Sequence, residues 1–378
     1  MAEIVRFDSL PFWRGVQSMP GVTESYPFGL SLDPRGFVRQ DTTEEQRHRI
    51  SRIYEQPDYV FITPPPGSSE WANAIGAAKV DAMLTACGSF DGMRVLEIGA
   101  GNLTIALEIV RRFKIQRYIA VDPTLPETGE AGIETRRSFF PSPSLSGLYF
   151  DIVVGLSCLE HVEDPVAFLG QARECLAPHG RIFLTFPDIG AMLRRGDLNA
   201  LVHEHMSYFD AAGFRSAAAC AGLDIVSLSS SNGLFSATLR AAETRPVERP
   251  PTFRDEAMAI RDAYRWVIET LGTAIRHDLK KGRRIAFHGA CPGLANFLWL
   301  TGLSGDESMI VADGDRSKWG KYLPACPVAI RMPDDTEYLQ ADRIYIAATS
   351  FSAEISRSLA AKGVRPDCIG LLTALGQP

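Results

Sequence analysis

Short apolar stretches alternate with amphipathic stretches along the middle of the chain. The runs MRVLEIGAG, RYIAVDP, YFDIVVGL and GRIFLTFPD are apolar and rich in β-branched residues, and segments of helical periodicity such as LTIALEIVRRF lie between them. This alternation predicts a parallel sheet with helices on both faces. The following stretch, GLDIVSLSSSNGLFSATLRAAE, predicts two strands joined by a turn. We therefore expect the sheet to end in an antiparallel pair.

The same pattern returns, at shorter length, in the last third of the chain. The proline-rich stretch AAETRPVERPPTF reads as a linker. A long amphipathic helix is expected from Arg254 to Lys281, and GRRIAFHGACPGLANFL then begins a second series of strand, turn and helix. The sequence thus predicts an α/β protein with an N-terminal extension at 1–70, a Rossmann-like domain at 71–245 and a smaller Rossmann-like domain at 253–378.

Composition narrows the class of ligand. The chain has 378 residues, enough for two cores, and 46% of them are hydrophobic. A net charge of −6 provides no electrostatic footprint for nucleic acid or an anionic membrane. The seven cysteines are widely spaced, and the N-terminal stretch lacks the apolar run of a signal peptide. We therefore expect a cytoplasmic protein whose partner is a small molecule, not nucleic acid or a membrane.

Two carboxylates stand at the ends of neighbouring predicted strands. Glu97 precedes a turn with Gly99 and Gly101, and Asp122 ends the next strand. Glycines let backbone N–H groups approach a ligand, and a carboxylate in the place of Asp122 suits the hydroxyls of a ribose. A site for NAD has the same outline, and a turn without a ligand is a further alternative. Glu97, however, would repel a pyrophosphate and attract the ammonium group of a methionine moiety.

The segment VHEHMSYFD, residues 202–210, follows the loop after GRIFLTFPD. Ligands of open parallel sheets bind beyond the carboxyl ends of the strands, so this segment is expected at the site. His205 beside Glu204 has the arrangement of a general base with an orienting carboxylate. His203 is either a structural residue or a substrate contact. A third ligand at recognisable spacing is missing from the His-x-His pattern, so we expect no metal.

The first glycine turn resembles the first motif of class I S-adenosylmethionine-dependent methyltransferases, acidic-x-G-x-G-x-G, with Leu103 in place of the last glycine. The resemblance implies S-adenosylmethionine as cofactor. Its expected contacts are Glu97, Gly99, Ala100, Gly101, Asp122, Pro123, Leu156 and Ser157. Tyr59 and Ser68, which precede the first helix of this domain, are candidates to cover the cofactor, and an ordinary proline-rich turn is the alternative.

The EHxSYF motif and the C-terminal runs are similar to those of sugar C-methyltransferases that act on nucleotide-linked deoxyketosugars. This resemblance implies that His205, with Glu204 beside it, removes the proton from a carbon next to a keto group. It also implies His161 of the LEH segment and Tyr208 as further site residues, and it leaves His203 as a substrate contact.

The C-terminal domain has its own candidate contacts. Gly289 in GACPG offers backbone amides to a phosphate, and Lys318 and Lys321 offer positive charge, which would suit the nucleotide part of a substrate. The alternative is a structural turn beside a solvated charged loop.

The chain also departs from that family. Val202 stands where the family has a tyrosine, Thr349 and Ser350 replace a tryptophan–asparagine pair, and residues 1–86 contain no cysteine for the family's zinc-binding module. These departures indicate a divergent member. We expect carbon methylation of a nucleotide-linked sugar. The alternatives are O- or N-methyl transfer to a sugar nucleotide or related small molecule and a non-catalytic nucleotide-sugar binding protein, and an NAD-dependent enzyme is the least favoured.

Overall fold

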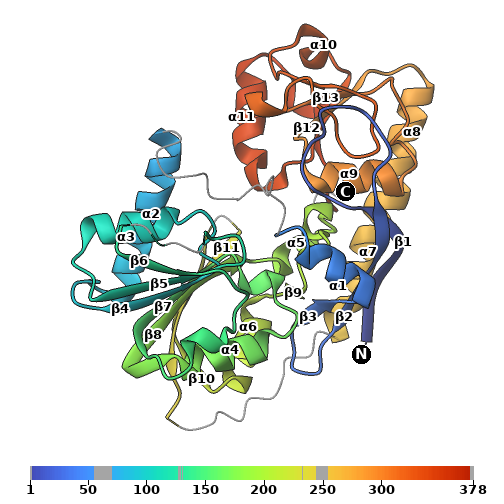
Figure 1. Cartoon of the computed structure of the whole chain (residues 1–378). Coiled ribbons are helices and arrows are strands. Elements are labelled where there is room, and N and C mark those ends of the chain that lie inside the picture. The colour runs from blue at the N-terminus through green and yellow to red at the C-terminus, as the bar shows by residue number, and fades with distance from the viewer. Residues whose placement is uncertain are drawn as a thin grey trace. The chain divides into compact units, whose positions relative to one another are not determined.

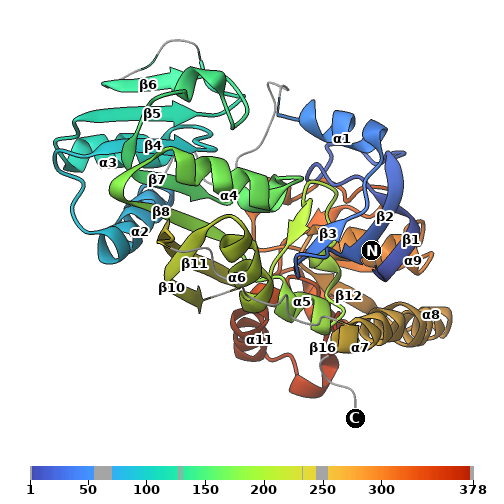
Figure 2. The same ribbon diagram turned by 90° about the horizontal axis from the view of Figure 1, so that it is seen from below.

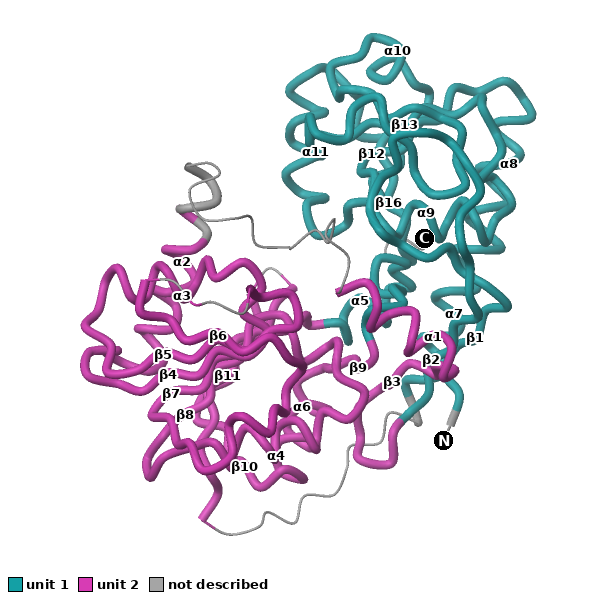
Figure 3. Tube along the Cα trace, viewed as in Figure 1, with its two compact units in different colours: residues 1–32, 189–205, 252–378 teal, residues 33–188, 206–251 magenta. Residues whose placement is uncertain are grey.

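The computed structural model describes residues 2–54, 70–126, 129, 131–231, 233–243 and 254–374 (Figure 1). The chain folds into two compact units, drawn in magenta and teal in Figure 3. The central unit comprises residues 33–188 and 206–251, and the terminal unit comprises residues 1–32, 189–205 and 252–378. The chain therefore enters each unit more than once, whereas the predicted domains were continuous; their boundaries stay a prediction.

The central unit contains a seven-stranded sheet with the strand order β10-β11-β8-β7-β4-β5-β6 (Figure 2). Its strands are β4 (Arg94–Ile98), β5 (Arg117–Val121), β6 (Ile133–Arg136), β7 (Phe150–Leu156), β8 (Leu176–Pro187), β10 (Leu223–Ser231) and β11 (Leu234–Ala241). The pairs among β4, β5, β6, β7 and β8 are parallel, and β11 pairs antiparallel with β8 and β10. The predicted α/β class and the terminal antiparallel pair are thus confirmed.

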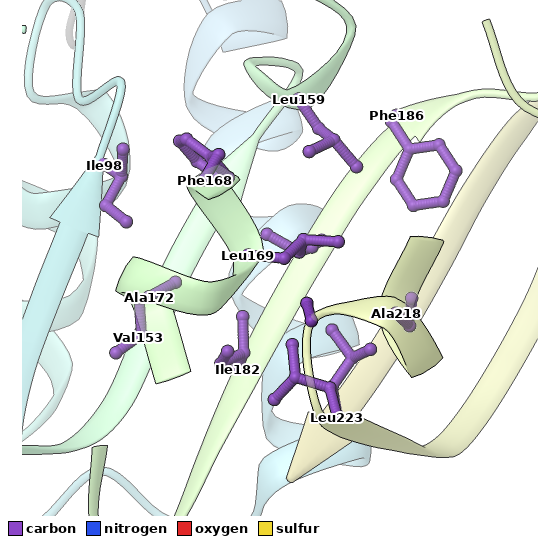
Figure 4. Close-up of a cluster of buried hydrophobic side chains, with 14 of the residues drawn as sticks. Ile98, Val153, Leu159, Phe168, Leu169, Ala172, Ile182, Phe186, Ala218 and Leu223 are labelled. Carbon is purple, nitrogen blue, oxygen red and sulfur yellow. The ribbon is translucent and has the colours of Figure 1, made fainter. Parts of the chain in front are cut away.

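Alternate residues of these strands pack on opposite faces of the sheet, as the two-residue period of a strand requires. Leu96 and Val153 belong to a buried cluster with α4 (Pro165–Glu174) and α6 (Ala211–Cys220), part of which is drawn in Figure 4. Their neighbours Val95 and Val154 belong to the cluster on the other face, with α2 (Glu70–Cys87) and α3 (Thr104–Arg112). Both faces of the parallel strands are covered, which explains why most positions in these strands are apolar.

Polar side chains cap the first turns of two helices of the central unit. The Thr43 side chain accepts from the backbone N–H of Gln46 at the start of α1 (Glu44–Ser51) and completes a capping box. Asp210 accepts from Gly213 N at 2.7 Å, so α6 starts directly after the 202–210 segment. The unit also holds β3 (Val38–Gln40), β9 (Ser207–Tyr208) and the short 3₁₀ turns η1 (Pro143–Leu145) and η2 (Leu159–His161).

The terminal unit holds a second parallel sheet, of order β14-β13-β12-β15-β16. The strands are β12 (Ile285–His288), β13 (Ile310–Ala312), β14 (Ile330–Arg331), β15 (Arg343–Ile346) and β16 (Ile369–Leu371). The helices are α5 (Gly190–Arg194), α7 (Arg254–Arg265), α8 (Gly272–Lys280), α9 (Pro292–Leu300), α10 (Thr336–Leu339) and α11 (Ser352–Ala361), and the 3₁₀ turns include η3 (Leu198–Ala200). A π-helical turn at Trp266–Leu271 joins α7 to α8, so the predicted long helix is continuous.

The first two strands pack within the terminal unit. β1 (Ala2–Pro11) and β2 (Ser25–Leu32) form an antiparallel pair. The Arg261 guanidinium on α7 donates to the carbonyl oxygens of Glu3 and Ile4, at 3.1 and 3.2 Å. In the described part of the chain, no helix combines the length and the apolar character that a membrane crossing requires.

Candidate active site

A pocket in the central unit lies at the carboxyl ends of β4, β5 and β7. Its lining includes every predicted cofactor contact that the structure describes: Glu97, Gly99, Ala100, Gly101, Asp122, Pro123, Leu156 and Ser157. Tyr59 and Ser68 lie outside the described residues. Because parallel strands end at one edge of the sheet, residues far apart in the sequence meet in this pocket.

The glycine turn after β4 brings backbone close to the next segment. Gly99 has a φ of +73°, and a Cβ built on it would lie 2.9 Å from the Cβ of Cys158. Gly101 has a φ of +53°, and its N–H donates to Asp122 Oδ2 at 3.0 Å. A side chain at Gly99 would therefore meet both a strained backbone and a steric barrier. The turn therefore packs closely against Cys158 while its residues line the pocket.

Asp122 is fixed from both sides. Besides Gly101, the backbone N–H of Thr124 donates to its Oδ1 at 2.8 Å, and the Thr124 hydroxyl donates to the same oxygen. The residue is 9% exposed and still borders the pocket. A carboxylate accepts at about four lone-pair positions, so one position stays available for a hydroxyl of a ligand.

Glu97 is almost fully buried at the base of the pocket. The hydroxyl of Tyr118 donates to its Oε2 at 2.8 Å, and burial raises the pKa of Glu97 to about 7. Lys79 of α2 also lines the pocket; burial lowers its pKa, while the charge of Glu97 opposes that effect. Sequence reasoning missed Lys79 and Tyr118. The signal for Lys79 was the single cation in the stretch ANAIGAAKVDAM.

The η2 turn contributes His161 to the pocket, as predicted from the sequence. Its Nδ1 lies 3.2 Å from the hydroxyl of Tyr54, another pocket residue that sequence reasoning missed. The neighbouring Glu160 is 1% exposed, and burial raises its pKa to about 8. Its Oε2 has no hydrogen-bond partner among the described residues. The turn thus carries an imidazole at the pocket and a carboxyl that is largely protonated at neutral pH.

The residues that follow His205 directly are bonded to this same turn. Met206 N donates to the carbonyl oxygen of Glu160 at 2.7 Å, and Ser207 Oγ donates to that of Val162 at 2.9 Å. Val162 also lines the pocket. Tyr208 pairs with Val38 of β3 and is only 1% exposed, so its side chain belongs to the core of the central unit.

The preceding part of the segment lies in the terminal unit. His203 is 3% exposed, its Nε2 lies 3.3 Å from the carbonyl oxygen of Tyr26, and the rings of Phe12, Tyr26 and Phe28 surround it. Burial lowers its pKa to about 4, so it is neutral at physiological pH. This environment supports the structural alternative for His203. Its role as a substrate contact stays a prediction.

Glu204 and His205 complete the segment. Burial raises the pKa of Glu204 to about 7, and the positive charge of Arg14 opposes the rise. His205 is half-buried, and its backbone N–H donates to the carbonyl oxygen of Val202 at 3.1 Å, which closes a turn over residues 202–205. The role of His205 as a base stays a prediction.

The candidate phosphate contacts of the terminal unit are engaged by protein groups. Gly289 N donates to Ala312 O at 2.8 Å. The Lys318 ammonium donates to Ala290 O at 3.1 Å and to Asp313 Oδ2 at 3.0 Å. Lys321 is exposed. These bonds favour the structural alternative for the GACPG turn, and phosphate binding there stays a prediction.

Comparison with known proteins identifies the chemistry of the central pocket. Residues 71–228 match a family model described as a methyltransferase domain. A protein named C-methyltransferase NovU, from Streptomyces niveus, is 26% identical over 301 residues, which are 73% of this chain and 71% of that protein. A ubiquinone biosynthesis O-methyltransferase of Cereibacter sphaeroides is 32% identical over 111 residues, 28% of this chain and 45% of that protein.

Solved structures of methyltransferases give partial overlaps. An S-adenosylmethionine-dependent methyltransferase from Mesorhizobium loti aligns with a TM-score of 0.37 at 12% identity, over 44% of this chain and 99% of its own. The DhpI–SAH complex aligns with a TM-score of 0.35 at 18% identity, over 53% of this chain and 95% of its own.

The chain is thus an enzyme with a methyltransferase domain, and S-adenosylmethionine is its methyl donor. The residues that line the pocket fit S-adenosylmethionine. The glycine turn at Gly99 borders the pocket, and Glu97 and Asp122 are acceptors suited to an ammonium group and a ribose hydroxyl.

Proposed function

We propose that the enzyme methylates a carbon atom of a nucleotide-linked keto sugar, with His205 as the base. The observation that carries the proposal is the attachment of the chain just after His205. Met206 and Ser207 bond to the carbonyl oxygens of Glu160 and Val162, on either side of the pocket residue His161. The peptide bond between His205 and Met206 is therefore held at the turn that borders the methyl-donor pocket.

The residues offer what this reaction needs. A carbon next to a keto group loses a proton only when a base accepts it and the keto oxygen shares the remaining charge. His205 would accept that proton, and Glu204 stands beside it in the sequence. S-adenosylmethionine supplies the electrophilic methyl group. His161, which lines the pocket beside Tyr54, would donate toward the developing oxygen charge.

Further support comes from the sequence. The EHxSYF motif resembles that of nucleotide-sugar C-methyltransferases, and a relative is itself named a C-methyltransferase. The net charge of −6 favours a small-molecule acceptor over nucleic acid, and the wide spacing of the seven cysteines supports a cytoplasmic location. We also retain 71–245 as the cofactor-binding domain and 253–378 as the domain that contributes to substrate binding.

The direct test combines labelled S-adenosylmethionine with a panel of nucleoside diphosphate sugars, both keto and non-keto, followed by mass spectrometry. We expect label on a carbon of a keto sugar nucleotide. In deuterated water without methyl donor, the enzyme should exchange the proton on the same carbon. Label on oxygen or nitrogen, with no carbon exchange, would overturn the carbon assignment.

A variant separates the base from the remaining site. His205→Ala should lower both methyl transfer and solvent exchange by about 100-fold or more, within the range for loss of a general base. His277→Ala is the matched control, because that histidine is exposed on α8 of the same unit. Binding of S-adenosylhomocysteine, followed by thermal shift with NAD as the negative control, should be unchanged in both. Full turnover by His205→Ala would remove the base assignment.

Methylation of a hydroxyl oxygen is the second candidate. It is favoured by the 32% identity to an O-methyltransferase and by Val202, which stands where the resembled family has a tyrosine. His205 would then deprotonate a hydroxyl group. The position of the label in the same mass spectra distinguishes the two reactions.

A further inference from the structure

The loop that precedes His205 is bonded densely to the second α/β sheet of its own unit. Asn296 of α9 donates from Nδ2 to the carbonyl oxygens of Leu198 and Leu201, at 3.1 and 2.7 Å. The hydroxyl of Thr349 donates to Oδ2 of Asp197. Asp197 is 0% exposed and Asn296 is 3% exposed. These are buried bonds between the loop and groups about 100 and 150 residues away in the chain.

The same loop contacts the GACPG turn, residues 289–293, whose last two residues begin α9. Asn199 accepts from the backbone N–H of Gly293 at 3.0 Å and donates to the carbonyl oxygen of Ala347 at 2.8 Å. A Cβ built on Gly293 would lie 2.5 Å from Cγ of Asn199, so only glycine admits this approach. The backbone N–H of Ala290 donates to Asp313 Oδ2 at 2.7 Å. The turn that resembles a phosphate site therefore holds a side chain of the enzyme itself.

We propose that this turn is a docking point for the loop at 197–201 and that Asn296 and Thr349 are positioning residues for His205. The inference rests on the proposed function, because it assigns a purpose to holding that histidine. Leu201 lies four residues before His205, and His203 between them is buried among aromatic rings of the same unit. The loop is thus fixed at successive points up to the turn at 202–205.

Positioning of this kind acts on the chemical step. A base must lie within hydrogen-bond reach of the proton it removes, and a displacement of about 1 Å can cost up to about 100-fold in rate. Cofactor affinity should not depend on these bonds, because the cofactor pocket is lined by residues of the central unit. A positioning role therefore predicts a lower kcat with unchanged affinity for S-adenosylhomocysteine.

The test compares two isosteric changes in the full-length enzyme. Thr349→Val removes the hydroxyl that binds Asp197. Thr301→Val removes an equally buried hydroxyl on the cap of α9 that donates only within its helix, to Phe297 and Leu298. Both should lower the melting temperature by a similar amount. Thr349→Ser keeps the hydroxyl and should behave like the wild type.

We expect Thr349→Val alone to lower kcat and carbon-bound proton exchange by about tenfold. It should also speed amide hydrogen exchange in residues 198–206, including the His205 N–H bonded to Val202. Equal kcat and equal amide exchange in the two valine variants would overturn the inference. If His205→Ala stays fully active, the proposed function fails instead, and the amide-exchange comparison still decides whether Thr349 holds the loop.

Discussion

At the scale of single residues, Glu97 shows how burial brings the pKa of a carboxyl group close to neutral pH. Burial raises its pKa to about 7, and the hydrogen bond from Tyr118 and the charge of Lys79 limit the rise. A cation that enters the pocket would favour the ionised form. Binding of an ammonium group therefore competes with binding of a proton at Glu97, and the competition takes place near neutral pH.

We expect the affinity for S-adenosylhomocysteine to weaken as pH falls from 7.5 to 6. Below the pKa of Glu97, the loss of affinity should approach about tenfold per pH unit. The α-amino group of the ligand stays mainly protonated over this range. Calorimetric titration in two buffers of different ionisation enthalpy should also detect proton release on binding. Lys79→Met should move the loss of affinity to higher pH, because the lysine charge lowers the pKa of Glu97.

The control is Glu97→Gln, which should bind more weakly but with little dependence on pH. A wild-type affinity that is constant between pH 6 and 7.5 would contradict the role of Glu97 as acceptor. Glu97 and Asp122 were predictable because each ends a strand beside a glycine turn or a proline. Lys79 and Tyr118 were not, because their spacing to Glu97 depends on how α2 and β5 pack in three dimensions.

At the scale of elements, the turn between β4 and α3 is shaped by a close approach between Gly99 and Cys158, which are 59 residues apart. Gly99 has a positive φ and also lies against Cys158. The glycine pattern predicted the turn, but the contact with Cys158 depends on the parallel pairing of β4 with β7. The sequence indicated that the backbone conformation at Gly99 favours glycine. It did not show that a side chain there would also clash with Cys158.

Gly99→Ala should therefore be more damaging than a glycine substitution with backbone strain alone. Gly92 is the matched control, since it has the same φ of +73° and no atom within 4 Å of a built Cβ. Gly92→Ala should cost about 1 kcal/mol in the free energy of unfolding, and Gly99→Ala about 1–3 kcal/mol more. Only Gly99→Ala should also weaken S-adenosylhomocysteine binding. Equal stabilities measured by urea unfolding would show that Cys158 yields to the added methyl group.

At the scale of the whole molecule, the sequence predicted both parallel sheets but not the path of the chain between them. Hydrophobic periodicity reports which face of a strand or helix is buried, and this signal is local. The hydrogen bonds of Asn199 and Asn296 to distant groups of the terminal unit produce no periodic pattern in the sequence. The 202–210 segment was thus found by its polar residues, whereas its division between the two units had no sequence signal.

Buried ionisable groups in both units determine how stability depends on pH. Burial raises the pKa of Glu97 and Glu204 to about 7 and that of Glu160 to about 8. Between pH 4.5 and 8 the folded chain keeps protons on these carboxyls that the unfolded chain has lost, so their contribution to stability falls as pH rises. Burial lowers the pKa of His203 and His288 to about 4, which gives the opposite trend between pH 4 and 6.5.

Above pH 6.5 the unfolded chain loses its remaining protons on these histidines, and the carboxyls contribute the larger part of the slope. We therefore expect the free energy of unfolding, measured by urea denaturation at constant ionic strength, to decrease from pH 6.5 to 8, on the order of 1 kcal/mol per pH unit. Glu160→Gln should flatten the decrease because its amide is neutral at every pH. A stability that rises between pH 6.5 and 8 would mean that these carboxyls are ionised and paired in the folded chain.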